Sequence, residues 1–338
     1  MPKASKGLLA CHCRMPMSEP LPLADLPREH LLALLEAHAF KPYRQYRTYS
    51  RKEQLAILQA EVDAALAVPG ELSRVLDADA PRAAAVVRPL AWDTAFFAVS
   101  MARIDYVLVT PEATRDDRAA VVSAACAAAR AAGVRHLTAR VDVADLDTLG
   151  VLEDHGFRTM DALVTYIMRP VKDPPRDVRA VGVIRESRQE DHAAILDITR
   201  EAYEGYRGRF HLDPHLSSTR ADELYVEWAR QCVSGAMSDI IMVSEDSHGR
   251  LQGYLAYRRR EPASSLGMPI FGGGLGACRR DAPGAYASLI RDATIWSHTR
   301  GGMGEYQTQN YNFAVIRVYE AAGAHYVRAE YTLHAWLG

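Results

Sequence analysis

The stretch TQNYNFAVIRVYEAAG, residues 308–323, predicts the end of a strand and then a helix that Gly323 ends. A strand over 304–309 precedes it, and residues 326–336 favour a last strand. The first half of the chain ends in the same order, with a strand, a helix, a glycine and a further strand (135–141, 144–155, Gly156 and 157–168). The two endings lie about 165 residues apart, which indicates a duplicated domain rather than a solenoid.

Outward from this stretch, both halves alternate strands and helices of moderate length. The expected strands are 102–109, 181–185, 239–245, 251–258 and 269–278, and the expected helices are 115–132, 189–203 and 284–299. This alternation predicts an α/β fold (α+β in detail), with central mixed sheets flanked by helices. Between the halves, residues 170–177 are charged and rich in proline, so we expect a linker at 171–178.

The front of the chain carries no chemical motif. Residues 1–24 lack periodicity and are expected to form a disordered tail. Residues 25–86 are expected to be a helical segment that precedes both domains, with helices over 28–39 and 51–66 and a short third helix over 71–76.

Composition narrows the class of protein. The chain has 338 residues, 49% of them hydrophobic and 24% charged, which excludes a disordered, coiled-coil or collagen-like chain. The net charge of -2 argues against a general polyanion binder, and no apolar run approaches the length that crosses a bilayer. The five cysteines are scattered, so we expect no disulfide framework and a cytoplasmic location. Cys11 and Cys13 flank a histidine but lack a second ligand pair, so no metal site is expected.

The second half resembles the GNAT superfamily of N-acyltransferases, because Asn312, Arg317, Tyr319 and Gly323 fall in that family's register. Two further segments, 90–97 and 220–228, resemble TDP-fucosamine acetyltransferase-like proteins. The resemblance covers roughly residues 87–338. It implies two tandem GNAT-like domains: a degenerate, structural one at 87–170 and a catalytic one at 179–338.

The implied activity is transfer of an acyl group from a phosphopantetheine thioester to a primary amine of a small-molecule metabolite, directly in a ternary complex. In this reaction a phenol beside the sulfur can protonate the leaving thiolate, and the resemblance gives that role to Tyr319. Asn312 is implied either as a contact to the pantetheine arm or as a helix cap. Two alternatives stay open: an aminoacyl-tRNA-dependent transferase, and an inactive GNAT-fold scaffold.

The donor site departs from the family's pattern. The stretch 281–286 has an acid at its first position, and Pro283 removes one N–H donor that would face a pyrophosphate. The donor is therefore an acyl group on a carrier protein or on coenzyme A, or else an aminoacyl-tRNA. We expect Leu275, Gly276, Ala277, Cys278, Gly284 and Ala285 to bind the donor arm, and we expect a cluster of arginines to dock the donor's carrier (Arg258, Arg259, Arg260, Arg279 and Arg280).

The acceptor is expected under the loop that follows the first helix of the second half. Its mixture of aromatic and polar side chains suits a small polar substrate. Tyr203, Tyr206 and His215 are the expected substrate contacts, with Tyr331 on the last strand, and His211 or Asp213 is the expected general base. Cys278 is expected to be a small buried thiol rather than an acyl-carrying nucleophile.

Overall fold

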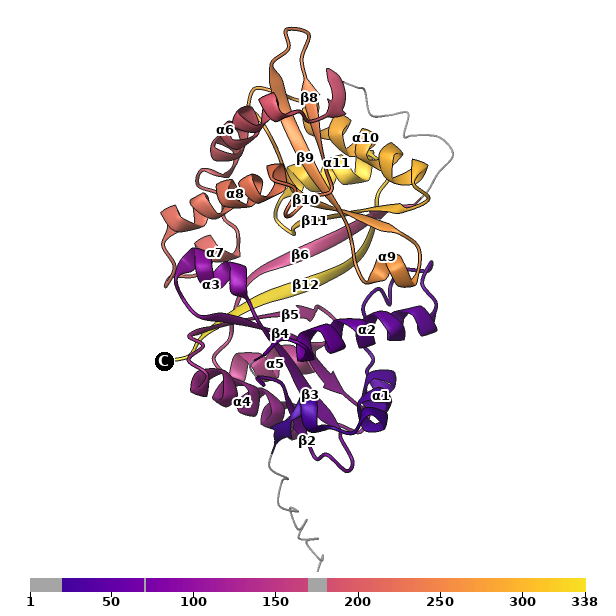
Figure 1. Ribbon diagram of the computed structural model, residues 1–338, viewed down its shortest axis with the longest axis vertical. Helices are drawn as coiled ribbons and strands as arrows, with labels where there is room; N and C mark the ends of the chain where they lie inside the picture. Colours follow the sequence, from indigo (N-terminus) through magenta and orange to yellow (C-terminus); the bar gives the residue numbers. More distant parts are fainter. Residues whose placement is uncertain (1–19, 70, 170–180) are drawn as a thin grey trace, which may run out of the picture.

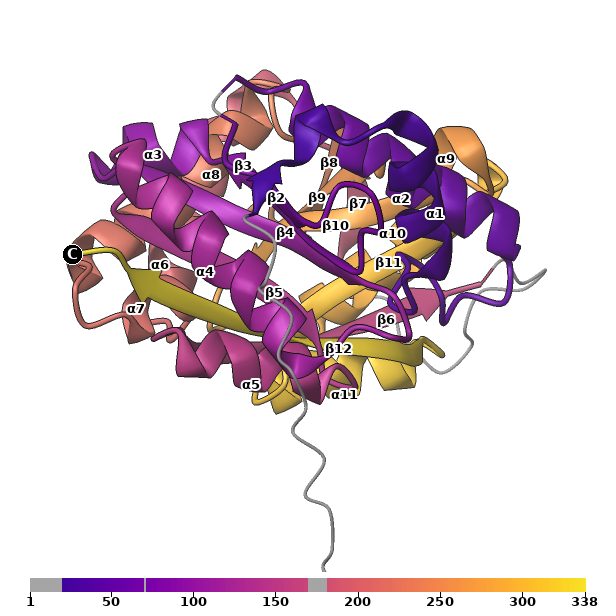
Figure 2. The same ribbon diagram turned by 90° about the horizontal axis from the view of Figure 1, so that it is seen from below.

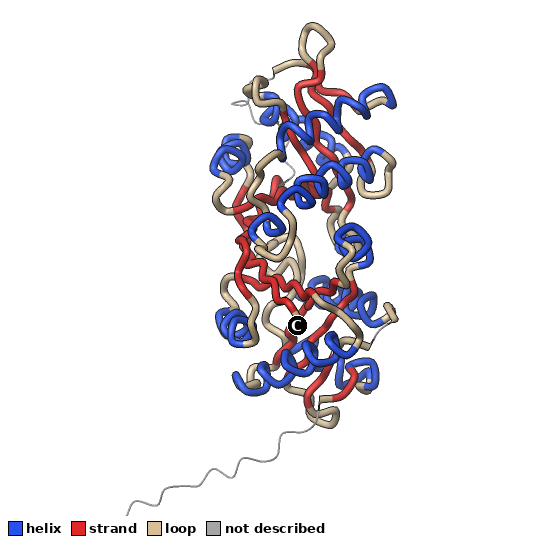
Figure 3. Tube along the Cα trace, turned by 90° about the vertical axis from the view of Figure 1, so that its left-hand side faces the viewer, coloured by secondary structure: helices blue, strands red, loops and turns tan. Residues whose placement is uncertain are grey.

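The computed structural model describes residues 20–69, 71–169 and 181–338. The expected linker 171–178, most of the expected tail, and Cys11 and Cys13 lie outside these residues. The described chain is elongated, with strands that continue from one half into the other and helices on both sides of them (Figures 1 and 3). The mixed α/β architecture agrees with the prediction.

A single twelve-stranded sheet runs through the described residues in the order β1-β2-β3-β4-β5-β12-β6-β11-β10-β9-β8-β7. The strands of the first half are β1 (Leu21–Pro22), β2 (Arg74–Leu76), β3 (Ala83–Pro89), β4 (Met101–Val109), β5 (His136–Asp142) and β6 (Arg158–Met168). Those of the second half are β7 (Val183–Glu186), β8 (Ile240–Glu245), β9 (Leu251–Arg259), β10 (Ile270–Cys278), β11 (Met303–Gln309) and β12 (His325–Trp336).

The two halves exchange their last strands (Figure 1). Strand β6 of the first half pairs antiparallel with β11, where Tyr166 lies opposite Tyr306. Strand β12 of the second half pairs antiparallel with β5, where Leu333 lies opposite Ala139. The two exchanged strands also pair with each other. The sheet is therefore continuous, and each half depends on a strand from the other.

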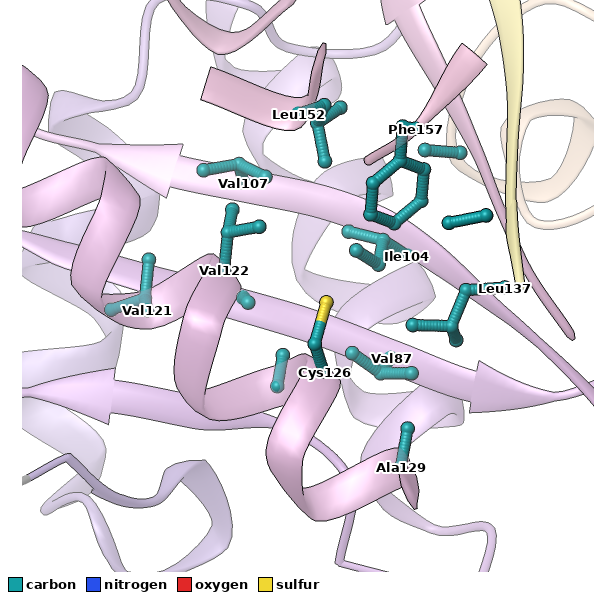
Figure 4. Close-up of a cluster of buried hydrophobic side chains, with 14 of the residues drawn as sticks. Val87, Ile104, Val107, Val121, Val122, Cys126, Ala129, Leu137, Leu152 and Phe157 are labelled. Carbon is teal, nitrogen blue, oxygen red and sulfur yellow. The ribbon is translucent and has the colours of Figure 1, made fainter. Parts of the chain in front are cut away.

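Helices cover both faces of the first half of the sheet (Figure 2). Alternate residues of a strand point to opposite faces. Ala83, Ala85 and Val87 of β3 therefore meet α4 (Arg115–Ala131) and α5 (Leu146–Asp154), as Figure 4 shows around Cys126. Ala84 and Val86 meet α1 (Arg28–Ala37) and α2 (Arg51–Leu66) on the other face.

The segment 25–86 is part of this sheet and not only a helical leader. Its two long helices form as expected, but residues 74–76 of the expected third helix form β2 instead, because they pair with β3. Residues 21–168 consequently follow the same order of main elements as residues 183–336.

The second half is built in the same layered way. On β9, Tyr254 and Ala256 pack against α6 (His192–Tyr203) and α8 (Ser218–Val233). Leu255 and Tyr257 pack on the opposite face against α10 (Ala285–Thr299) and α11 (Phe313–Ala321). The remaining short helices are α3 (Ala91–Phe97), α7 (Arg209–Leu212) and α9 (Ala263–Leu266), with 3-10 turns at Leu23–Asp25 and Gln189–Asp191.

Candidate active site

The central feature of the second half is a gap between two parallel strands. β10 and β11 pair only where Ile270, Phe271 and Gly272 lie opposite 303–305, and then they separate. The pairing of β10 with β9 is also irregular between Gly273 and Gly276. The strands diverge into a cavity of about 590 Å³. Its described walls include Leu275, Gly276, Ala277, Cys278, Asn312 and Tyr319, all of them predicted site residues.

Tyr319 lies at the closed side of this cavity with only 2% of its surface exposed. Its hydroxyl is 3.2 Å from that of Tyr286 on α10 and 3.4 Å from the carbonyl oxygen of Gln307. Burial raises the pKa of Tyr319 well above that of a free phenol. The side chain is therefore a neutral hydroxyl at physiological pH, able to donate a hydrogen bond or a proton.

Asn312 is a helix cap. Its side-chain oxygen accepts from the backbone N–H of Val315 at 3.5 Å, and its amide donates to the Thr308 hydroxyl at 3.0 Å. These bonds fix the turn between β11 and α11, and this turn sets the direction in which Tyr319 points into the cavity.

A hydrogen-bonded chain crosses from the helices of the second half to the first half. The Tyr206 hydroxyl donates to the side-chain oxygen of Gln309, and the Gln309 amide donates to Asp161 Oδ2 at 3.4 Å. Asp161 lies on β6, is 6% exposed, and leaves Oδ1 without a hydrogen-bond partner. Among the described residues that line the cavity, Asp161 is the only carboxylate.

Aromatic side chains form the wall opposite β11. The Tyr203 hydroxyl donates to the Gly276 carbonyl at 3.0 Å, and the Tyr203 ring stacks on Tyr225 with centroids 4.1 Å apart. Trp228 on α8 extends this wall, and Tyr286 on α10 also lines the cavity. Of the predicted acceptor contacts, Tyr203 and Tyr206 therefore reach the cavity.

The other predicted acceptor residues lie elsewhere in the described structure. His211 bonds Asp222 at 2.9 Å, His215 is exposed, and neither lines the cavity. Tyr331 packs against the hydrophobic core of the first half. Neither His211 nor Asp213 lines the cavity, although Arg209 and Phe210 of the same segment do, so a general base at His211 or Asp213 stays a prediction that this geometry does not favour.

Asp213 is instead the centre of a buried polar cluster. Its carboxylate accepts from His334 Nδ1 at 2.8 Å, from Trp336 Nε1 at 3.1 Å and from the His215 backbone at 3.0 Å, and His136 Nε2 lies 3.4 Å away. His136, Asp213 and His334 have the composition of a metal-binding group. The donors around the carboxylate bond both oxygens and link the α7 loop to strands β5 and β12, whereas both ring nitrogens of His136 and Nε2 of His334 are buried without a hydrogen-bond partner.

The start of α10 carries the stretch predicted to hold the donor's phosphates. Gly284 has a φ of 86°, a left-handed conformation that favours glycine, and it begins the helix. Asp281 forms an exposed ion pair with Arg250 at 3.0 Å. Neither Gly284 nor Ala285 lines the cavity, which is bounded on this side by Tyr286.

The five predicted docking arginines do not form one surface. Arg258 lies opposite Gly272, at the start of β10, whereas Arg279 follows Cys278 at the end of the same strand. Gly272 and Arg279 are seven residues apart, so at about 3.3 Å per residue the two groups are separated by roughly 23 Å along the strand. Both Arg279 and Arg280 are bound to Glu201, Arg259 pairs with Glu261, and Arg260 lines the cavity beside Glu305.

Cys278 is partly buried and packs against the hydrophobic core of the second half. Burial raises its pKa to about 12, so the thiol stays protonated and is a poor nucleophile. Together with Cys126 and Cys232 it is a free cysteine.

The first half has an equivalent gap, between β4 and β5, which pair only from Met101 to Ile104. A cavity of about 730 Å³ lies there. Several of its charges are paired: Arg88 and Arg103 both bind Asp105, and Tyr106 donates to Glu61. Arg140 lines this cavity as well as the cavity of the second half.

Sequence reasoning missed Arg140, Asp161 and Arg209 of the cavity wall. Two of these belong to the first half and reach the cavity only through the exchange of β6 and β12. No signal in the sequence reports which strands pair across the halves. In the described residues, no helix is both long and apolar enough to cross a membrane.

No family model matches the chain. It is 29% identical over 148 residues to the spore coat polysaccharide biosynthesis protein SpsD of Bacillus subtilis, covering 44% of this chain and 48% of that protein, about half its length. It is 23% identical over 251 residues to the dTDP-fucosamine acetyltransferase of Escherichia coli O6:H1, covering 74% of this chain and 98% of the relative.

Two solved structures share the architecture over nearly the whole chain. A GCN5-related N-acetyltransferase from Sphaerobacter thermophilus matches with a TM-score of 0.59 and 14% identity, covering 95% of each chain. A tandem GNAT protein from the clavulanic acid biosynthesis pathway matches with a TM-score of 0.54 and 16% identity, covering 94% of this chain and 98% of that one. The chain therefore has the tandem GNAT fold, and its resemblance to the N-acyltransferases of that fold is confirmed.

Proposed function

We propose that the cavity of the second half transfers an acyl group from a phosphopantetheine thioester, on coenzyme A or on a carrier protein, to a primary amine of a small-molecule metabolite. The observation that carries this proposal is the gap between β10 and β11, which opens onto a cavity with a buried tyrosine hydroxyl and one carboxylate. The names of the E. coli and S. thermophilus relatives, both acetyltransferases, favour an acetyl group.

The donor arm is proposed to lie along β10 from Gly273 to Cys278. Because β11 no longer pairs with this segment, its backbone amides are available to the amides of a pantetheine. A side chain at Gly276 would meet Leu255 at 2.7 Å and Tyr286 at 3.4 Å, so the glycine keeps this path open. This fit concerns the pantetheine arm, which coenzyme A and carrier proteins share.

The reaction is proposed to proceed by direct attack of the acceptor amine on the thioester. Asp161 Oδ1, free of other partners, accepts a proton from the acceptor amine, and the nitrogen attacks the thioester carbonyl carbon. As the tetrahedral intermediate collapses, the carbon–sulfur bond breaks and Tyr319 donates a proton to the leaving sulfur. The proton taken up by Asp161 returns to Tyr319 through solvent, so the products are an amide and a free thiol.

Replacing the proposed acid tests this function. With acetyl-CoA or an acetyl-loaded carrier protein and a panel of primary amines, we expect amine-dependent release of thiol. Tyr319→Phe should lower kcat by about 100-fold to 1,000-fold with little change in KM, because it removes only the proton donor.

Tyr166→Phe is the matched control. The Tyr166 ring packs 5.6 Å from the Tyr319 ring, but its hydroxyl faces Glu320 and does not line the cavity. Full activity of a folded Tyr319→Phe protein would remove the role given to this residue. Absence of thiol release with both donors across the panel of amines would favour a GNAT-fold binding protein. Turnover with charged tRNA alone would favour an aminoacyl-tRNA-dependent transferase.

A further inference from the structure

Two arginines from different halves face the same cavity without a carboxylate partner. Arg140 lies on β5 and Arg209 begins α7, and both line the cavity of the second half. Within the described residues, neither guanidinium forms an ion pair, and Nε of Arg140 is buried without a hydrogen bond. The Arg209 guanidinium lies over the neighbouring Phe210 ring, 4.5 Å from its centroid.

Placing two unpaired arginines in one cavity is unfavourable as long as no anion is bound. Burial, and next the charge of Arg209, lower the pKa of Arg140 to about 9. Burial also lowers the pKa of Arg209 itself. Two like charges that repel each other in a partly enclosed cavity are costly unless a negative charge joins them.

The surrounding charges do not neutralise the excess positive charge of Arg140 and Arg209. Asp161 and Asp93 attract Arg209, and Asp161 and Glu330 attract Arg140, but none of them comes within ion-pair distance of either guanidinium. Glu330 is paired with Arg328 at 3.5 Å instead. Arg103, which adds positive charge to the same region, is bound by Asp105. In the equivalent cavity of the first half, by contrast, Arg88 and Arg103 share that carboxylate.

We propose that Arg140 and Arg209 bind an anionic oxyacid group, a carboxylate or a phosphate, carried by the acceptor amine. The assignment of the anion to the acceptor rests on the proposed acyl transfer. Binding of an anion by Arg140 and Arg209 does not depend on it. Guanidinium groups recognise carboxylates and phosphates through paired N–H donors. With Asp161 receiving the amine, the acceptor class becomes an amine that also carries a negative charge, such as an amino acid or an amino-sugar phosphate.

An amine without an anionic group would bind weakly in this cavity. It would leave the two repelling charges of Arg140 and Arg209 unneutralised in the occupied cavity. The anion site also requires both halves of the chain, since Arg140 comes from the first and Arg209 from the second. The exchange of strands thus supplies specificity as well as stability.

Binding is tested first, without any donor. Thermal unfolding and calorimetry of the full chain are measured with inorganic phosphate, pyrophosphate and acetate, for wild type, Arg140→Gln, Arg209→Gln and the exposed control Arg135→Gln. We expect at least one anion to stabilise wild type and Arg135→Gln, and both cavity variants to lose at least tenfold in affinity. Comparing the affinities for phosphate and acetate shows whether the site prefers a phosphate or a carboxylate.

The anion-free melting temperature separates a binding role from a structural one. Arg140→Gln removes an unpartnered charge, so its melting temperature without anion should equal or exceed that of wild type. A clear fall in that temperature, or unchanged anion binding in both cavity variants, would overturn the proposal. So would the absence of binding by all three anions to wild type.

Matched acceptor pairs then test specificity: glucosamine 6-phosphate against glucosamine, and an amino acid against its amide. We expect kcat/KM in wild type to favour one anionic member by about 100-fold, and Arg140→Gln to reduce that preference to less than tenfold. Equal use of charged and neutral members would overturn the assignment to the acceptor. If anions bind but no amine is acylated, the proposed function fails while the anion site stands.

Discussion

Single residues of this protein derive their roles from what surrounds them. Asp161 has one oxygen held by Gln309 and the other free, which suits a group that receives a proton from a substrate. Asp213 has a similar degree of burial, but three donors bond its carboxylate, which suits a group that holds two elements together. Two buried aspartates thus differ in function because their hydrogen-bond partners differ.

Buried histidines predict how stability depends on pH. Burial lowers the pKa of both His334 and His38 to about 4. Between pH 6.5 and about 4, the unfolded chain therefore binds protons that the folded chain does not, so stability falls as the pH falls through this window. We expect a loss of roughly 3 kcal/mol per histidine between pH 7 and pH 4, measured by urea unfolding.

The substitution His334→Gln should remove about half of that pH dependence, whereas His325→Gln, at an exposed position, should leave it unchanged. Protonation of Asp213 also lowers the free energy of unfolding, at a lower pH than that of the histidines. Burial alone would raise its pKa, but hydrogen bonds from His136, His334, His215 and Trp336 lower it overall, so its contribution is lost as the pH falls below about 4. A pH-independent unfolding free energy from 7 to 4 would contradict this picture.

At the scale of elements, the loop between α1 and α2 connects the halves. Tyr46 is 1% exposed and its hydroxyl donates to Glu305 on β11 at 2.5 Å. Tyr46→Phe should lower the free energy of unfolding by about 1–3 kcal/mol, because Glu305 would lose a partner while buried. Denaturant titration checks this.

Tyr43→Phe provides the matched control for the Tyr46 substitution. Tyr43 stacks on Tyr49 in the same cluster, but no hydrogen bond to its hydroxyl is found in the described residues. Its substitution should change the unfolding free energy by less than about 0.5 kcal/mol. Equal effects of the two substitutions would show that ring packing, and not the bond to Glu305, holds this contact.

Most elements could be predicted from the sequence, because hydrophobic spacing and glycine stops are local signals. The helix over 313–321 with Asn312 before it, and the strands around Gly276, follow directly from such signals. Pairing of β6 with β11 could not be predicted, since strand exchange depends on contacts far apart in the chain. Tyr203, Tyr206 and Tyr319 lie in segments with local signals, and all three line the cavity. Asp161 and Arg140 reach the cavity only through the exchange of strands, so the sequence did not point to them.

At the scale of the whole molecule, the exchanged strands predict one cooperative unit. β6 and β12 each complete the sheet of the other half, so neither half keeps a complete sheet if the other unfolds. Differential scanning calorimetry should show a single transition whose calorimetric and van't Hoff enthalpies agree. Two separate transitions would mean that the halves are stable independently.

Residues of both halves form the cavity, and Asp161→Asn examines their joint action, because a first-half residue is proposed to act in the reaction of the second half. The measurement is the rate of amine-dependent thiol release for wild type and Asp161→Asn at equal melting temperature. We predict a loss of at least about 100-fold in kcat/KM for Asp161→Asn. A wild-type rate in a folded Asp161→Asn protein would contradict the account.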